Sequence, residues 1–177
     1  MIIRYNGELH KIEEYIHRTP GNLRAFVQAK LRNMRNGKVT ENRFRSGEEV
    51  EEVRMETKEF QYLYHDGASY QVMDKESYEQ IPVDEGVLGG GAKFLKEGET
   101  IQLMITEGQV IGAELPFKVE LRVTETVPGV KGDTASNTLK PATVETGATV
   151  NVPLFINEGD TVRVDTRTGD YLERVNA

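Results

Sequence analysis

Short alternations of apolar and polar residues run through most of the chain and predict β-strands. Apolar residues alternate with period 2, in a chain stretch enriched in Val, Ile, Thr and aromatic residues, in three clear segments, Ala25 to Leu31, Val119 to Val123 and Val150 to Leu154. Dipeptides that tolerate positive φ predict tight hairpin turns at Asn6-Gly7, Asn36-Gly37 and Asp66-Gly67. Only Lys75 to Gln80 and Val87 to Leu95 favour short helices. The pattern therefore predicts an all-β protein.

The second and third parts of the chain resemble each other at a fixed spacing. Phe94 to Leu103 matches Phe155 to Val164 at an offset of 61 residues, and Gly108 then falls opposite Gly169. Such similarity predicts two copies of one structural unit. Many short strands in units of this size favour small closed barrels over a sandwich.

The same offset, counted back from the C-terminus, divides the chain into three expected domains, 1–52, 53–115 and 116–177. The whole chain has a formal net charge of −7, whereas these domains carry +2, −7 and −2 in that order. The first domain is therefore the candidate for contact with nucleic-acid phosphate, and the acidic middle domain is expected to be a spacer or a protein-facing surface.

The basic residues of the first domain are concentrated in one predicted hairpin. Residues 15–45 hold eight Lys or Arg and one acid, Glu41. A two-residue turn at Asn36-Gly37 would place Lys30 opposite Arg43 and Arg32 opposite Glu41. Alternation then gives a core face with Ala25, Val27, Ala29, Leu31 and Phe44, and a basic face with Arg24, Phe26, Gln28, Lys30, Arg32, Arg43 and Arg45.

Other candidate chemistry is weak. The chain has no Cys, which excludes disulfides, thiolate metal sites and a cysteine nucleophile. His10, His17 and His65 lack metal-ligand spacing, and no serine sits in a nucleophile elbow. Residues 89–93 are glycine-rich but lack Walker spacing, so we expect a flexible connection there. We expect no enzymatic activity, no cofactor and no metal.

The aromatic residues of the middle domain allow two interpretations. Phe60, Tyr62, Tyr64 and Tyr70 are either a stacking platform for RNA or core and hairpin residues, and the domain charge of −7 favours packing. No apolar run is long enough for a membrane helix, and the N-terminus lacks a secretory signal. We therefore expect a soluble, cytoplasmic and monomeric protein.

Several motifs resemble those of one family, bacterial elongation factor P. The C-terminal third contains Lys140-Pro141-Ala142, Gly147, Val150, Val152-Pro153, Ile156 and Gly159, preceded by Pro128 to Ala135. Arg54 to Ile81 resembles the family's middle domain, with Gln61 to Tyr64 and Met73-Asp74. Pro20-Gly21 and Ala25-Phe26 resemble its N-terminal loop. The resemblance covers essentially the whole chain.

This resemblance implies an SH3-like (KOW-type) domain followed by two OB-fold domains. It implies a translation elongation factor that binds the 70S ribosome between the peptidyl and exit sites. Such a factor positions peptidyl-tRNA, contacts ribosomal RNA and stimulates peptide-bond formation at stalls on proline runs. A general RNA-binding barrel protein and a specialised paralogue of the family are the alternatives.

The resemblance, together with the basic face of the hairpin, assigns residues to three contact regions. The loop tip near the tRNA acceptor end comprises Pro20, Gly21, Asn22, Leu23 and Arg24. The residues expected to hold RNA phosphates are Arg18, Lys30, Arg32, Arg43 and Arg45. Contact with the codon and the small subunit is expected for Gly132, Asp133, Thr134, Tyr171 and Arg174.

Two departures from the family pattern affect these expectations. Asn22 and Leu23 stand where well-known branches have a modified Lys or Arg followed by Gly, and neither lysylation nor rhamnosylation is chemically possible at Asn22. The chain also begins inside the region that resembles the family's first strands. Either the start site is assigned late, or the first barrel closes differently and exposes an edge.

Overall fold

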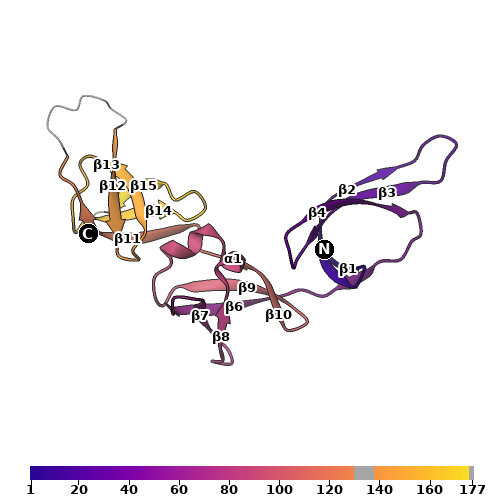
Figure 1. Cartoon of the computed structure of the whole chain (residues 1–177), viewed down its shortest axis with the longest axis horizontal. Helices are drawn as coiled ribbons and strands as arrows, with labels where there is room; N and C mark the ends of the chain where they lie inside the picture. The colour runs from indigo at the N-terminus through magenta and orange to yellow at the C-terminus, as the bar shows by residue number, and fades with distance from the viewer. Residues whose placement is uncertain (130–137, 176–177) are drawn as a thin grey trace. The chain divides into compact units, whose positions relative to one another are not determined.

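The computed structural model describes residues 1–129 and 138–175, and it consists almost entirely of strands (Figure 1). Three five-stranded sheets follow one another along the chain, and the all-β prediction is confirmed. The backbone forms two compact units, one of residues 1–57 with 104–111 and the other of residues 58–103 with 112–177.

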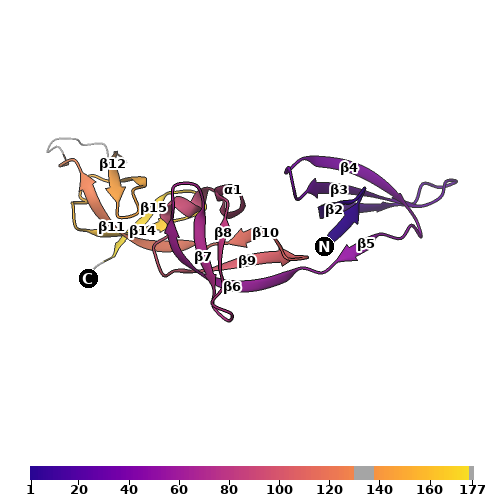
Figure 2. The ribbon, with the colours of Figure 1, turned by 60° about the horizontal axis from the view of Figure 1, so that its bottom comes forward.

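The N-terminal sheet has the strand order β4-β3-β2-β1-β5 (Figure 2). Its strands are β1 (Ile2–Tyr5), β2 (Glu8–Arg18), β3 (Phe26–Asn33), β4 (Val39–Arg45) and β5 (Glu51–Val53). Asn6 and Gly7 both have positive φ and join β1 to β2 as predicted. Ile3, Ala29, Leu31 and Phe44 are buried together, which confirms the predicted core face of the hairpin.

The turn between β3 and β4 is longer than predicted, and the predicted register is wrong by two residues. Lys30 pairs with Glu41 and Gln28 with Arg43, so Lys30 and Arg43 are not opposite each other. The cause is Asn33, whose side-chain Oδ1 accepts hydrogen bonds from the backbone N–H groups of residues 35 and 36. This Asx-type turn extends the loop to residues 34–38. A shift of two residues leaves each side chain on its predicted face.

The middle and C-terminal sheets have the same topology. The middle sheet, ordered β10-β9-β6-β7-β8, contains β6 (Glu56–His65), β7 (Tyr70–Asp74), β8 (Gln80–Val83), β9 (Thr100–Thr106) and β10 (Gln109–Glu114). The C-terminal sheet, ordered β13-β12-β11-β14-β15, contains β11 (Lys118–Thr126), β12 (Leu139–Val144), β13 (Thr149–Pro153), β14 (Thr161–Asp165) and β15 (Tyr171–Val175). The order β10-β9-β6-β7-β8 of the middle sheet corresponds strand by strand to the order β15-β14-β11-β12-β13 of the C-terminal sheet.

Backbone hydrogen bonds confirm the predicted repeat at its offset of 61. The Gly98 N–H donates to the Tyr62 carbonyl at 2.8 Å, and the Gly159 N–H donates to the Val123 carbonyl at 2.9 Å. Both glycines have a φ of 89°. The β6–β7 and β11–β12 pairings also share a bulge one residue beyond these carbonyls. The two sheets are therefore copies of one unit, down to their irregularities.

The helical predictions are half right. Residues 75–79 form a turn, whereas α1 (Glu85–Leu88) and the 3-10 helix η1 (Gly90–Phe94) occupy the second predicted stretch. The glycine-rich segment 89–93 therefore lies mostly within η1. Within it, a Cβ on Gly91 would lie 2.8 Å from the Thr166 carbonyl oxygen of the C-terminal barrel. The predicted turn at Asp66-Gly67 is also longer, because His65 pairs with Tyr70.

Phe94 ties the middle barrel to the C-terminal barrel. Its side chain is 1% exposed, belongs to the C-terminal core cluster and lies 3.3 Å from the Cβ position of Gly169. The repeat-equivalent residue, Phe155, is 57% exposed. The two phenylalanines therefore share a sequence position but not an environment.

Replacing Gly91 with Ala should weaken the packing of the two barrels. The new methyl group would press on the Thr166 carbonyl, and such overpacking costs about 1–3 kcal/mol. Gly90→Ala is the matched control, because nothing lies within 4 Å of its Cβ position. Urea unfolding of both variants checks this, and an equal loss of unfolding free energy for Gly90→Ala and Gly91→Ala would contradict it.

Asp165 should make the C-terminal barrel sensitive to acid. Hydrogen bonds from the Arg167 side chain and backbone lower the pKa of Asp165 to about 2, whereas an unfolded Asp titrates near ~3.9. Its contribution to stability is therefore complete above about pH 5 and is lost as the pH falls towards about 2. Asp165→Asn should melt at a lower temperature at neutral pH, and its melting temperature should fall less on acidification. If the melting temperatures of the wild type and of Asp165→Asn fell equally as the pH was lowered across this range, Asp165 would have no such role.

Candidate RNA interface on the N-terminal ribbon

The predicted tip lies at the end of a long two-stranded ribbon formed by β2 and β3 (Figure 1). Residues 19–25 connect the strands, and the Leu23 N–H donates to the Pro20 carbonyl at 3.1 Å, which makes Gly21 and Asn22 the central residues of a turn. Asn22 is exposed, and Leu23 is 73% exposed. The tip therefore offers a short amide and an apolar side chain to solvent.

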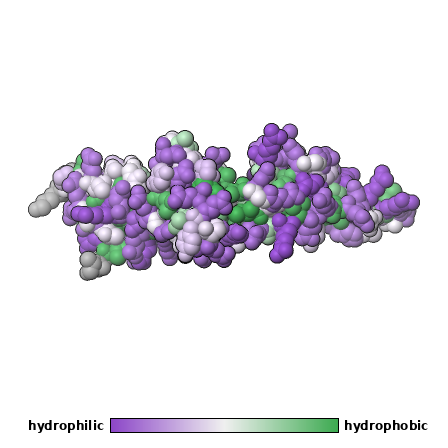
Figure 3. All heavy atoms as spheres, turned by 90° about the horizontal axis from the view of Figure 1, so that it is seen from below, coloured by the Kyte–Doolittle hydropathy of each residue, from purple (hydrophilic) through white to green (hydrophobic). Residues whose placement is uncertain are grey.

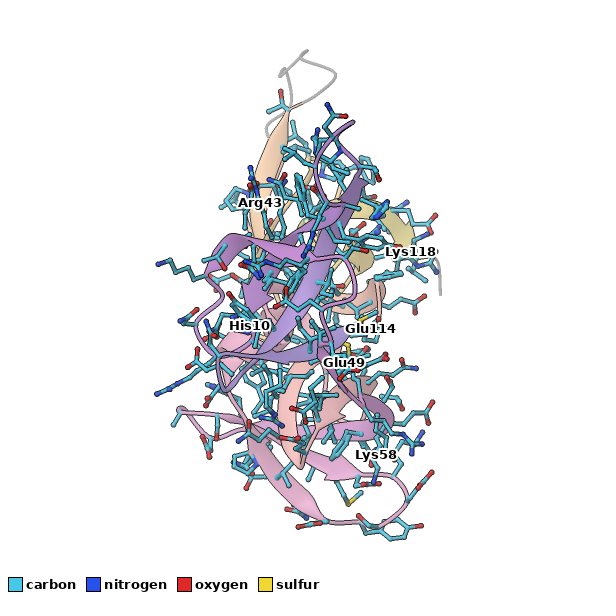
Figure 4. All side chains as sticks on the ribbon, turned by 90° about the vertical axis from the view of Figure 1, so that its right-hand side faces the viewer. His10, Arg43, Glu49, Lys58, Glu114 and Lys118 are labelled. Carbon is cyan, nitrogen blue, oxygen red and sulfur yellow. The ribbon has the colours of Figure 1, made fainter. Side chains whose placement is uncertain are left out.

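Next to the tip, arginines surround an aromatic ring on one face of the sheet. Phe26 pairs with Arg18 on β2 and with Arg45 on β4, and residues that pair directly share a face. The Arg43 guanidinium, labelled in Figure 4, lies 5.1 Å from the centre of the Phe26 ring. The pairing thus brings Arg18, Arg43 and Arg45 around Phe26.

Farther from the tip, the predicted RNA-binding residues are paired with acids. A β-bulge at Glu13 shifts the β2 register, so that Glu14 pairs with Lys30 and faces outward with it. The Lys30 Nζ lies 2.9 Å from Glu14 Oε2, and Arg32 forms an ion pair with Glu13. The Arg32 hydrogen bond is the main cause of the lowered pKa of Glu13, and the hydrogen bond to Glu14 raises the pKa of Lys30.

The predicted basic face is therefore divided into two parts. In the described part of the chain, no carboxylate forms an ion pair with Arg18, Arg24, Arg43 or Arg45, whereas Lys30 and Arg32 are each neutralised by a neighbour. Strand alternation missed this division, because the bulge that turns Glu13 and Glu14 towards the basic face leaves no clear mark in the sequence.

In the C-terminal barrel, a second bulge brings Tyr171 and Arg174 to the same face. Tyr171 pairs with Val164 and Arg174 with Val162, which leaves one extra residue between them. Tyr171 packs against the core, while the Arg174 guanidinium lies 5.3 Å from the centre of the exposed Phe155 ring. Phe155 was not among the predicted contact residues. Gly132, Asp133 and Thr134 lie outside the residues that the structure describes.

The described residues on either side of this segment make close contacts. Lys140 is 4% exposed, and its Nζ donates to the Val127 carbonyl. A Cβ on Gly129 would lie 2.6 Å from the Leu154 carbonyl oxygen, so the backbone approaches here as only glycine allows.

The remaining candidates are structural or exposed residues. Phe60, Tyr62 and Tyr70 are buried, as the packing interpretation predicts, whereas Tyr64 is 50% exposed. His10 is buried, with its Nδ1 3.0 Å from the Glu8 carbonyl oxygen. Among residues 1–129 and 138–175, no cluster of His, Asp and Glu could hold a metal ion, and no helix is long and apolar enough to cross a membrane. The face drawn in Figure 3 is mostly hydrophilic.

Three family models match the chain in succession. Residues 1–50 match the elongation factor P KOW-like domain, residues 55–113 match the elongation factor P OB domain, and residues 119–174 match the elongation factor P C-terminal domain. These matches agree with the predicted SH3-like domain followed by OB folds.

Close relatives and a solved structure give the same result. The chain is 53% identical to elongation factor P from Chloroherpeton thalassium over 175 residues, which cover 98% of this chain and 93% of that one. It is 54% identical to elongation factor P from Maridesulfovibrio salexigens over 172 residues, which cover 97% and 92%. Its fold resembles that of a translation initiation factor 5A from Methanococcus jannaschii, with a TM-score of 0.53, 18% identity, and coverage of 64% of this chain and 81% of that one. The chain belongs to the elongation factor P family of translation elongation factors.

Proposed function

We propose that this factor binds the 70S ribosome between the peptidyl and exit sites and stimulates peptide-bond formation when synthesis stalls on proline runs. Its proposed domains are 1–52, 53–115 and 116–177. The first presents the ribbon tip to the acceptor end of peptidyl-tRNA. The third, through residues 132–134 with Tyr171 and Arg174, contacts the codon and the small subunit.

The observation that carries the proposal is the group of arginines behind the tip. Arg18, Arg43 and Arg45 surround Phe26, and no described carboxylate neutralises them. Unpaired arginines bind phosphate with charge-assisted hydrogen bonds, and their release of counterions makes the binding salt-dependent. Arg24 extends the same charge to the tip itself.

The proposed mechanism is positional rather than covalent. A peptidyl-tRNA that ends in proline is readily displaced from a reactive pose, and holding the reactants in place can lower a barrier by several kcal/mol. Here the anchoring groups are the arginines, because Asn22 has a short neutral side chain. Leu23 stands where the family's well-known branches have glycine, and its smaller backbone freedom reduces the entropy lost when the tip is ordered.

Replacing single arginines should separate the two parts of the basic face. Arg18→Gln and Arg45→Gln should each lower proline-stall rescue in a reconstituted translation assay by about three- to ten-fold. Each substitution removes a cation that has no ion-pair partner and can contact an RNA phosphate. The matched controls Lys30→Gln and Arg32→Gln should have smaller effects, since these cations are already paired with Glu14 and Glu13.

Binding measurements on the wild-type factor test the ribosomal role itself. The wild-type factor should bind ribosomes that carry a peptidyl-tRNA much more tightly than free single-stranded RNA at physiological salt. Equal binding to both would favour a general RNA-binding protein.

The rescue assay also tests the division of the basic face. Equal losses of rescue for the variants of the unpaired arginines and for the variants of Lys30 and Arg32 would show that the ion pairs open on the ribosome.

The tip itself should act mainly through Arg24. Arg24→Ala should weaken rescue more than Asn22→Ala, because it removes a long charged side chain, whereas the side chain of Asn22 is short and neutral. Equal or reversed losses in the same translation assay would indicate that reach from position 22 still dominates.

An intact-mass measurement on protein from the native host completes this test. We expect the mass of the unmodified chain. Extra mass that maps to residues 18–26 would contradict an unmodified tip and would identify the extended group.

A further inference from the structure

A cleft of about 840 Å³ opens between the middle and C-terminal barrels, inside the unit of residues 58–103 and 112–177. Its walls come from β6 and β7, from η1 and the segment that follows it, and from the turn between β12 and β13. The volume falls within the range of ligand-binding pockets. None of the residues assigned to the tip or to the codon region lines it.

Buried aromatic and aliphatic side chains form the floor of the cleft. Tyr62 and Tyr70 are 6% and 7% exposed, and their ring centres lie 5.7 Å apart. Leu95 and Ala148, 4% and 9% exposed, belong to the same lining. At the edge, Tyr64 remains 50% exposed. Such a surface suits one large apolar or aromatic group, which would lose its water on entering.

One residue of the cleft lining also carries an unpartnered polar atom. Thr146 Oγ1 is buried and has no hydrogen-bond partner among the described residues. The turn does not need it, because the Val144 N–H donates to the Ala148 carbonyl and the Gly147 N–H donates to the Val144 carbonyl. A buried hydroxyl without a partner costs free energy, which a ligand that hydrogen-bonds to it would recover.

The charges around the cleft distinguish between classes of ligand. Two lysines and two glutamates share the rim, and the Lys96 Nζ lies 3.9 Å from Glu145 Oε1. Domain 53–115, which supplies most of the lining, has a net charge of −7. A balanced rim on an acidic domain disfavours a polyanion such as RNA and favours a neutral or basic protein segment.

We propose that this cleft binds a protein segment in which one large apolar side chain is flanked by Lys or Arg. The apolar side chain rests on Tyr62 and Tyr70, and a backbone N–H of the segment donates to Thr146 Oγ1. The flanking cations face the acidic middle barrel. The proposal concerns a protein contact on the larger unit, so it stands or falls independently of the RNA contact at the ribbon tip.

A titration of the full chain with short peptides, followed by amide NMR, tests the proposal. The probe is acetyl-Lys-Trp-Lys-amide, which should cause saturable shifts at the amides of Tyr64, Thr146 and Gly147. Acetyl-Glu-Trp-Glu-amide should bind about five-fold more weakly, because its charges oppose those of the domain. Acetyl-Lys-Gly-Lys-amide, which lacks the anchor, should cause no saturable shift there.

Two variants test the contacts, each with the folded state checked in the same spectra. Thr146→Val keeps the side-chain shape and should weaken binding of the tryptophan peptide about three- to ten-fold through the lost hydrogen bond. Tyr64→Ala should also weaken it, whereas the matched control Tyr78→Ala, at a position 71% exposed and outside the cleft lining, should not. Tighter binding of adenosine monophosphate than of the peptide at these amides would overturn the proposal in favour of a nucleotide site. Absence of shifts at residues 145–148, or equal effects of Tyr64→Ala and Tyr78→Ala, would overturn it outright.

Discussion

The insertion of Phe94 into the C-terminal core is the contact on which the larger unit depends. A barrel of this size buries too little apolar surface to be very stable alone, so a shared core residue contributes to both partners. Gly91 permits the approach, because any side chain there would meet the Thr166 backbone. The cleft lies beside this contact, since η1 and the segment after it, which follows directly from Phe94, form one of its walls.

Much of this fold could be predicted from alternation and from the repeat, whereas the register could not. The offset that aligns Phe94 with Phe155 also aligns backbone hydrogen bonds and a bulge, because both reflect one duplicated backbone path. The Asn36-Gly37 turn was misjudged because Asn33, outside the dipeptide, caps the loop with its side chain. Turn length thus depended on a residue that a search for turn dipeptides does not consider.

Which basic residues of the candidate site form ion pairs could not be predicted from the sequence either. The sequence places Arg18, Lys30 and Arg43 in one basic segment, and all three are near the ribbon. Their electrostatic states differ because a single inserted residue on the neighbouring strand carries two glutamates to their face. Ion pairs across strands depend on register to within one residue, and a bulge changes that register without a clear mark in the sequence.

The contrast between Phe94 and Phe155 bears on how such a chain could be lengthened. Both barrels carry an aromatic residue at this position of the repeat, but among the described residues only Phe94 is buried in the core of another barrel. Phe155 is exposed, and its ring lies against Arg174 instead. A designed barrel placed after Phe155 would need a glycine at the position of Gly169 to receive the ring. The C-terminal barrel would need a change as well, because its residue equivalent to Gly91 is Val152, whose side chain would stand where the Phe94 joint requires a glycine.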